Sequence, residues 1–317
     1  MSGDRPAAPG AGSLSGFKRL ARDLVRRKPL GAAGGAVALA LFLVAVFADA
    51  LAPYGFNATS LLHALQKPGA AHWFGTDELG RDVLSRVIYG ARVSLYVGLA
   101  ATALAVILGS LIGVVSGYFG RGVDLMLQRL VDAWMAFPGL VMVIVILALL
   151  GPGLWSVILA LGLSYAFPLS RIIRSAAMVV REQPYIDASR AVGASHRRIL
   201  ARHVMPNIMA PIIIVASNSM GFVILVEAAV SFLGYGVPPP QPSWGGMLSA
   251  TGRQYMLRAP WLSAFPGIAL GLAVFSFNVL GDALRDLLDP RLAGSDGISR
   301  QTPSAAPLSE TRARSPR

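Results

Sequence analysis

The sequence predicts an all-α membrane protein with six transmembrane helices and both termini in the cytoplasm. Hydrophobic residues make up 54% of the chain and charged residues only 14%, and the mean hydropathy is +0.59, a composition typical of a polytopic membrane protein. Six apolar stretches reach about 20 residues, enough to cross ~30 Å of hydrocarbon at ~1.5 Å per residue. Alternate segments between them carry 22 Lys and Arg on one side and six on the other, and the basic side is expected to be cytoplasmic.

Composition also excludes several kinds of chemistry. The chain has no cysteine, which excludes disulfides, thiol catalysis and thiolate metal sites. Its four histidines show no metal-ligand spacing. No lysine stands in a Gly-Lys-[Ser/Thr] sequence, so a phosphate-binding P-loop is absent and any ATP must bind elsewhere. The net charge of +12 follows membrane topology, so we expect no nucleic acid partner and no cofactor on this chain.

The N-terminal region leads into the first span. Residues 1–13 are rich in Pro, Gly and Ala and are predicted to be disordered. Residues 14–30 alternate apolar and basic side chains at helical spacing, which favours an amphipathic helix on the lipid surface over a solvated helix. Residues 31–51 form the first span. A secretory signal is the alternative, but the basic region is long and further spans follow.

The segment 52–92 is expected outside the membrane, ahead of a second span at 93–117. Thr76 or Asp77 is predicted to cap a helix that lies on the outer surface. On that helix Asp82 and Arg86 fall at i,i+4 and are expected to pair.

The remaining spans are predicted at 126–150, 155–174, 208–232 and 261–281. The tripeptide Ala-Phe-Pro occurs at 136–138, 166–168 and 264–266, and proline inside a span kinks its helix. The loop 233–260 is expected outside, and residues 293–317 are predicted to be a disordered tail. Four tryptophans near the outer ends, Trp73, Trp155, Trp244 and Trp261, favour the membrane interface.

A polar loop at 175–207 interrupts the apolar runs and is predicted to hold two short helices. Pro184 suits a first helical position, and Asp187 places a negative charge in the first turn. Gly193 can end that helix at positive φ. Ser195 can cap a second helix, which Pro206 is expected to end.

This loop resembles the cytoplasmic EAA loop of ABC-importer permeases: an acidic residue, two small residues, a glycine and, about a dozen residues later, a proline. The resemblance implies docking into a cleft on the ATP-hydrolysing subunit. A solvated basic linker is the alternative from the loop alone. The residues expected in this contact are Tyr185, Asp187, Ala188, Ser189, Gly193, Ala194, Ser195, His196, Arg197 and Pro206.

Further motifs resemble the C-type permease subunit of dipeptide and oligopeptide ABC importers. They are Gly-Thr-Asp-Glu-Leu-Gly-Arg-Asp at 75–82, the Tyr-Gly-Ala-Arg-Val-Ser-Leu run at 89–95, Pro-Ser-Trp-Gly at 242–245 and Asp-Ala-Leu-Arg-Asp at 282–286. The similarity covers roughly residues 25–292. Tyr235, Pro238 and Ala283 depart from the family pattern and leave the substrate less certain.

The resemblance implies that 31–292 adopts the type I ABC-importer permease fold in a bacterial or archaeal cytoplasmic membrane. It also implies a heterodimer with a homologous permease, two ATP-binding subunits that hold ATP and Mg, and an extracytoplasmic peptide-binding protein. Nickel or another small solute is the alternative to peptide. A secondary transporter is a more distant alternative, and a membrane enzyme would need paired acids or an activated nucleophile in the spans.

Two further sets of residues are candidates for functional contacts. An ionisable or polar group within a span is a functional hypothesis by default, so Asn218, Glu227 and Asn278 are assigned to a possible translocation path. Glu227, like Asp132, could instead serve a structural role. On the outer side the residues expected to face the binding protein are Ser85, Gln241 and Trp244.

Overall fold

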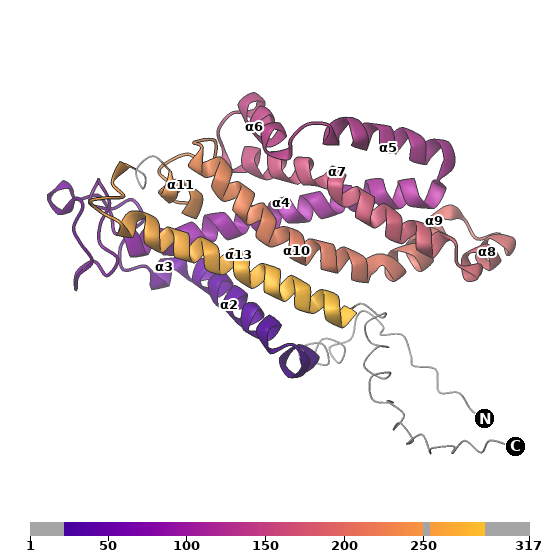
Figure 1. Ribbon diagram of the computed structural model, residues 1–317, viewed down its shortest axis with the longest axis horizontal. Coiled ribbons are helices and arrows are strands. Elements are labelled where there is room, and N and C mark those ends of the chain that lie inside the picture. The colour runs from indigo at the N-terminus through magenta and orange to yellow at the C-terminus, as the bar shows by residue number, and fades with distance from the viewer. Residues whose placement is uncertain (1–21, 250–253, 289–317) are drawn as a thin grey trace, which may run out of the picture.

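The computed structural model describes residues 22–249 and 254–288 of the chain. The predicted tails at 1–13 and 293–317, and residues 14–21 of the amphipathic segment 14–30, lie outside the described residues. Figure 1 shows an elongated bundle whose long helices run roughly along its longest axis. In the described part of the chain, five helices are long and apolar enough to cross a membrane, and a sixth crossing is possible if one bent pair counts as a span.

Helices account for most of the described chain. They are α2 (Pro29–Val46), α3 (Ala48–Leu51), the 3-10 turn η1 (Leu61–His63), α4 (Val83–Phe119), α5 (Arg121–Met135), α6 (Gly139–Leu150), α7 (Leu154–Arg181), α8 (Pro184–Ala191), α9 (His196–Ile199), the π turn η2 (Leu200–Val204), α10 (Met205–Phe232), α11 (Trp244–Leu248) and α13 (Trp261–Leu288).

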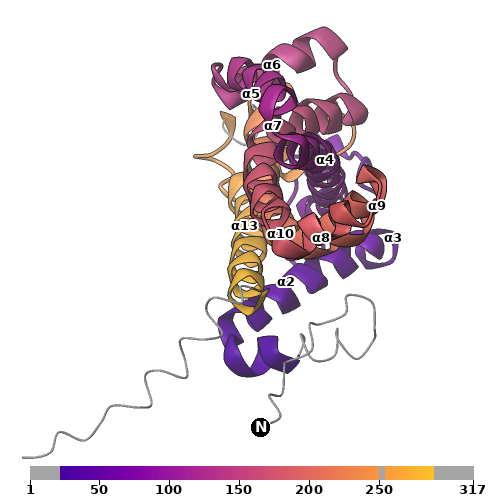
Figure 2. The same ribbon diagram turned by 90° about the vertical axis from the view of Figure 1, so that its right-hand side faces the viewer.

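The two ends of the bundle differ. Helices α8 and α9 project at one end, which we call the elbow end, and the loop 52–82 and α11 lie at the other, the cap end (Figure 1). Figure 2 views the molecule from the elbow end. The long helices extend beyond the predicted spans towards the elbow end: α7 continues to Arg181 and α13 to Leu288. The predicted loop 175–207 therefore begins inside α7.

The predicted surface helix before the second span is wrong. Helix α4 is a single helix of 37 residues, about 55 Å long at the usual rise. Its N-cap is Asp82, whose carboxylate accepts the backbone N–H of Ser85 at 2.8 Å, rather than Thr76 or Asp77. Residues 83–92 are consequently the first turns of the same continuous helix and not a separate surface helix.

The charged residues of the cap end form a buried network instead of the predicted pair. The side-chain partner of Asp82 is His72 and not Arg86: Nδ1 of His72 lies 2.9 Å from a carboxylate oxygen of Asp82. Arg86 lies 3.6 Å from the carboxylate of Asp77, which also binds Arg81 at 2.6 Å. Asp77 is buried. Its carboxylate accepts the backbone N–H groups of Leu79 and Arg81 and so stabilises the turn that precedes α4.

The third predicted span is a bent pair of helices. Helices α5 and α6 meet at 87°, and the break falls at the first Ala-Phe-Pro, residues 136–138. The α conformation is disfavoured for Phe137 because a proline follows it. The prolines of the other two copies, Pro168 and Pro266, lie within α7 and α13, which continue through them.

Close backbone contact joins α4 to α7. Gly109, Gly113 and Gly117 recur every four residues and therefore line one face of α4. A Cβ atom at Gly113 would lie 2.5 Å from the carbonyl oxygen of Ser170. Small residues allow such an approach between membrane helices, so this stripe fixes the spacing of the two helices.

Candidate functional site

The elbow between α8 and α9 has the turn chemistry that the sequence predicts. Helix α8 starts at Pro184 and is followed by Gly193 at φ +78°. The N–H of Gly193 donates to the oxygen of Arg190 at 2.9 Å, and that of Ala194 donates to Ser189 at 3.0 Å. This pair of bonds is a Schellman motif, which satisfies the last carbonyls of the helix.

The second half of the elbow is continuous with a membrane span, contrary to the expectation that Pro206 ends it. Ser195 caps α9, and its hydroxyl accepts the N–H of Arg198 at 3.4 Å. The helix then runs without a break from His196 to Phe232. The π turn places the N–H of Met205 on the oxygen of Leu200, one residue further back than in an α-helix. Pro206 is the second residue of α10, where its missing N–H is tolerated.

Two isoleucines anchor the elbow to the bundle. Ile186 on α8 and Ile199 on α9 are fully buried in an otherwise exposed segment. They belong to a cluster formed by α4, α7 and α10, whose other buried members are Val114, Tyr118, Ile173, Ala177, Val204, Ile208 and Ile212. Sequence reasoning missed these anchors, although two isolated apolar residues in a polar loop are a usable signal.

Tyr118 is a second missed residue, and no sequence pattern marks it. It lies at the elbow end of α4 and is buried, and its hydroxyl is 2.9 Å from Nδ1 of His196. The guanidinium of Arg190 stacks over its ring at 5.6 Å. Tyr118 therefore contacts both halves of the elbow, and any displacement of the elbow reaches α4.

The opposite face of the elbow is open. Asp187 pairs with Arg190 at 3.0 Å, and the hydroxyl of Ser189 donates to the oxygen of Tyr185 at 2.7 Å. These bonds leave a partly apolar surface that protrudes from the bundle. Its exposed residues are Tyr185, Asp187, Ala188, Val192 (85% exposed) and Arg197.

Two of the three predicted docking side chains lie in the interior. Ser85 is fully buried, and its hydroxyl donates to the Asp82 carboxylate at 2.7 Å. Trp244 is also fully buried, and its indole N–H donates to the oxygen of Val87 at 3.0 Å. Neither can contact a partner in this structure, because each holds the loops of the cap end against α4. Gln241 is exposed.

The tryptophan argument for the membrane interface fails at the same end. Trp261, like Trp244, is buried, and its indole N–H donates to the oxygen of Thr76 at 3.2 Å. Trp73 and Trp155 are exposed, as expected for interfacial side chains.

The predicted path residues do not converge on one place. Glu227 is fully buried and accepts a hydrogen bond from Ser231 at 2.7 Å. Asn278 packs against Gly221 on α10, where a Cβ atom would lie 2.6 Å from its oxygen. Asn218 lines a cavity between α7, α10 and α13. Asp132 forms a half-exposed ion pair with Arg171, so it joins α5 to α7.

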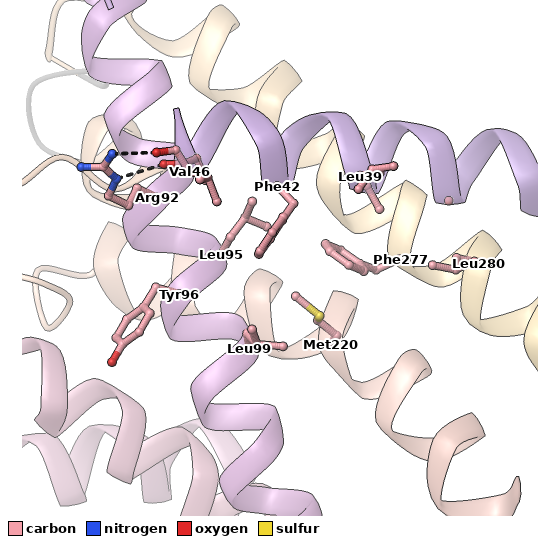
Figure 3. A pocket seen from close by; sticks show the side chains of 13 residues that line it. Leu39, Phe42, Val46, Arg92, Leu95, Tyr96, Leu99, Met220, Phe277 and Leu280 are labelled. Atoms are coloured by element: carbon pink, nitrogen blue, oxygen red, sulfur yellow. Dashed lines mark hydrogen bonds between the residues drawn. The ribbon is translucent and has the colours of Figure 1, made fainter. Parts of the chain in front are cut away.

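An apolar cavity of about 540 Å³ lies between α2, α4, α10 and α13. Figure 3 shows Phe42, Leu95 and Phe277 pointing into it. Its one charged residue, Arg92, donates to the oxygen of Ala45 at 2.9 Å and binds Asp49 at 2.9 Å. The cavity therefore offers little besides hydrocarbon contact. Among residues 22–249 and 254–288, no group of three or more His, Cys, Asp or Glu could hold a metal ion.

The fold is that of a type I ABC-importer permease. It is similar to a chain of the MetNI methionine ABC transporter in inward-facing conformations, with a TM-score of 0.52 and 18% identity over 64% of this chain and 96% of that one. The amino-acid sequence narrows the assignment further.

Residues 109–294 match the family of binding-protein-dependent transport system inner membrane components, and residues 17–68 match the N-terminal transmembrane domain of oligopeptide transport permease C. The chain belongs to the first of these families, and it is a multi-pass protein of the inner membrane. Permeases of this kind work with ATPase and substrate-binding partners. This result favours an ABC permease over the secondary transporter and the membrane enzyme.

Three named relatives extend over nearly the whole chain. One is a peptide transport system permease protein of Brucella suis biovar 1, 46% identical over 86% of this chain and 91% of that protein. The dipeptide transport system permease protein DppC of Alkalihalophilus pseudofirmus is 40% identical over 88% and 91%. The oligopeptide transport system permease protein OppC of Bacillus subtilis is 36% identical over 90% and 96%.

Proposed function

We propose that this chain is the C-type permease subunit of an ATP-driven peptide importer. In the proposed complex it pairs with a homologous permease, two ATP-binding subunits lie at the elbow end, and an extracytoplasmic peptide-binding protein docks at the cap end. Peptide is favoured over nickel or another small solute because the relatives are named for peptide, dipeptide and oligopeptide transport. ATP and Mg would be held by the ATP-binding subunits alone.

One observation carries the proposed coupling role of the elbow: its outer face is open while its inner face is tied to three spans. Ile186, Ile199 and Tyr118 connect the elbow to α4 and α7, and α9 continues into α10. A displacement imposed on the exposed face would therefore move the spans instead of being absorbed by a flexible linker. That is the mechanical requirement for transmitting ATP-driven closure.

Cysteine cross-linking tests this arrangement cleanly, since the natural chain has no cysteine. In the complete importer, Ala188→Cys should cross-link to the ATP-binding subunit. Gln241→Cys, at the opposite end, should cross-link to the binding protein and serves as the control. Cross-linking of Ala188→Cys to the binding protein, or to lipid alone, would contradict the coupling role.

A second experiment tests the division of labour. Because no lysine stands in a P-loop sequence, the purified chain alone should neither bind nor hydrolyse ATP. Equilibrium binding of a labelled ATP analogue to the isolated chain measures this. Saturable binding with an affinity of order micromolar would show that the chain has a nucleotide site of its own.

A further inference from the structure

A second cavity, of about 670 Å³, lies between the elbow-end halves of α7, α10 and α13. Most of its wall is aliphatic, and its polar lining residues are Asn207, Asn218, Ser219 and Arg285. Ligand sites are typically clefts of ~300–1,000 Å³ with mostly apolar walls and a few convergent polar groups. This cavity has that size and that composition.

Arg285 is the only charged residue in the lining. It forms no ion pair or hydrogen bond with any of the described residues, and the carboxylate next to it in the sequence, Asp286, is held by Lys28 at 2.6 Å. The arginine of the apolar cavity is different, because Arg92 is bound to backbone oxygens and to Asp49. The guanidinium of Arg285 thus keeps its donors for a ligand, and its planar fork suits a carboxylate.

Asn218 lines the same cavity as Arg285. A Cβ atom at Gly281 would overlap Oδ1 of Asn218, so the amide sits beside Gly281 on α13. Arg285 follows four residues later, about 6 Å along the helix axis. The amide and the arginine therefore line the same cavity about one helical turn apart.

We propose that this cavity is a substrate site on the cytoplasmic side of the path, in which Arg285 binds the C-terminal carboxylate of the peptide. Asn218 and Ser219 are placed to bond the amide groups of the last residues. The aliphatic wall accommodates side chains of varied shape. This proposal rests on the proposed peptide-import function and adds to it the recognition of a free carboxylate.

The experiment uses the complete importer in proteoliposomes, with dialanine and dialanine amide as substrates at saturating concentration of the loaded binding protein. Wild type should import the free acid faster than the amide. In Arg285→Gln the ratio of the two rates should fall about tenfold, since a hydrogen-bonded charge pair is lost. In Arg285→Glu the preference should reverse. The matched control is Arg129→Gln, which removes an exposed arginine on α5 outside the cavity and should keep the wild-type ratio.

The outcomes separate the proposal from the function on which it rests. An unchanged ratio in Arg285→Gln, or an equal loss of both substrates in that variant, would overturn the carboxylate site. If Arg285→Gln does not assemble, Arg285→Met replaces it: this variant also removes the positive charge, the same fall in the ratio is expected, and an unchanged ratio would overturn the site. If Arg285 instead binds a lipid phosphate, the ratio of the two import rates should be the same in Arg285→Gln as in wild type. Failure of the wild-type complex to import either compound would instead refute the peptide function.

Discussion

At the scale of single residues, the turn of the elbow depends on a glycine at position 193. Gly193 adopts φ +78°, a region that strains residues with a Cβ atom. No other atom lies within 4 Å of the position that a Cβ would occupy. The glycine is therefore required by its backbone conformation and not by lack of space.

Gly193→Val should damage transmission without disturbing the spans. The strain at this position is on the order of 1–3 kcal/mol, which favours a rearranged elbow. In the complete importer, peptide transport should fall while the chain still inserts and pairs with the second permease. The matched control is Gly122→Val, whose Cβ also meets open space but at no positive φ. Normal transport in Gly193→Val would mean that the shape of the elbow is not needed.

The buried side chain of Trp244 stabilises the packing of the cap end against α4. Trp244→Ala should lower the free energy of unfolding by about 3–5 kcal/mol, because a large side chain is removed from the interior. Thermal unfolding in detergent measures the change. Trp73→Ala, at a site that is 69% exposed, should stay within about 0.5 kcal/mol. Equal free energies of unfolding of the two variants would contradict a stabilising role for Trp244.

At the scale of helices, the structure combines one close contact with one break. The glycine stripe of α4 brings it against α7 along the elbow-end half of both helices. Helices α5 and α6 bend away at 87°, yet α5 stays tied to α7 through Asp124 and Arg174, whose side chains are 2.5 Å apart. Helices α4, α5 and α7 therefore form one unit, and the elbow is anchored to α4 and α7 within it.

Gly113→Val tests that unit. Its side chain would collide with the backbone of α7, and overpacking of this kind costs about 1–3 kcal/mol. A lower melting temperature of the purified complex is the expected result. Gly271→Val is the control, because it makes the same change in α13 where no atom lies within 4 Å. Equal melting temperatures would show that α4 and α7 can separate freely.

At the scale of the whole molecule, orientation follows from charge. The sequence assigns 22 Lys and Arg to the segments predicted to share the side of the 175–207 loop and six to the other segments, so we expect the elbow in the cytoplasm by the positive-inside rule. Because the helix ends alternate between the two ends of the bundle (Figure 1), one confirmed side fixes all the others.

Reporter fusions measure that orientation directly. Fusions at Gly31, Ala194 and Arg291 should report the cytoplasm, and fusions at His72 and Gly246 the exterior. The physical reason is that Lys and Arg are concentrated in the segments expected in the cytoplasm, and such basic segments resist translocation. An external signal at Ala194 would refute both the orientation and the coupling role of the elbow.

The sequence by itself determined the features that depend on neighbouring residues. Hydropathy located five helices that are long and apolar enough to cross a membrane, and a sixth stretch that forms the bent pair α5 and α6. Pro184, Gly193 and Ser195 specified the elbow because capping and positive φ are local properties. Tertiary structure decided the rest. The burial of Trp244, the contact of Tyr118 with His196 and the cavity around Arg285 bring together residues dozens to more than 150 positions apart. Such contacts depend on how helices pack, and periodicity along one segment carries no information about them.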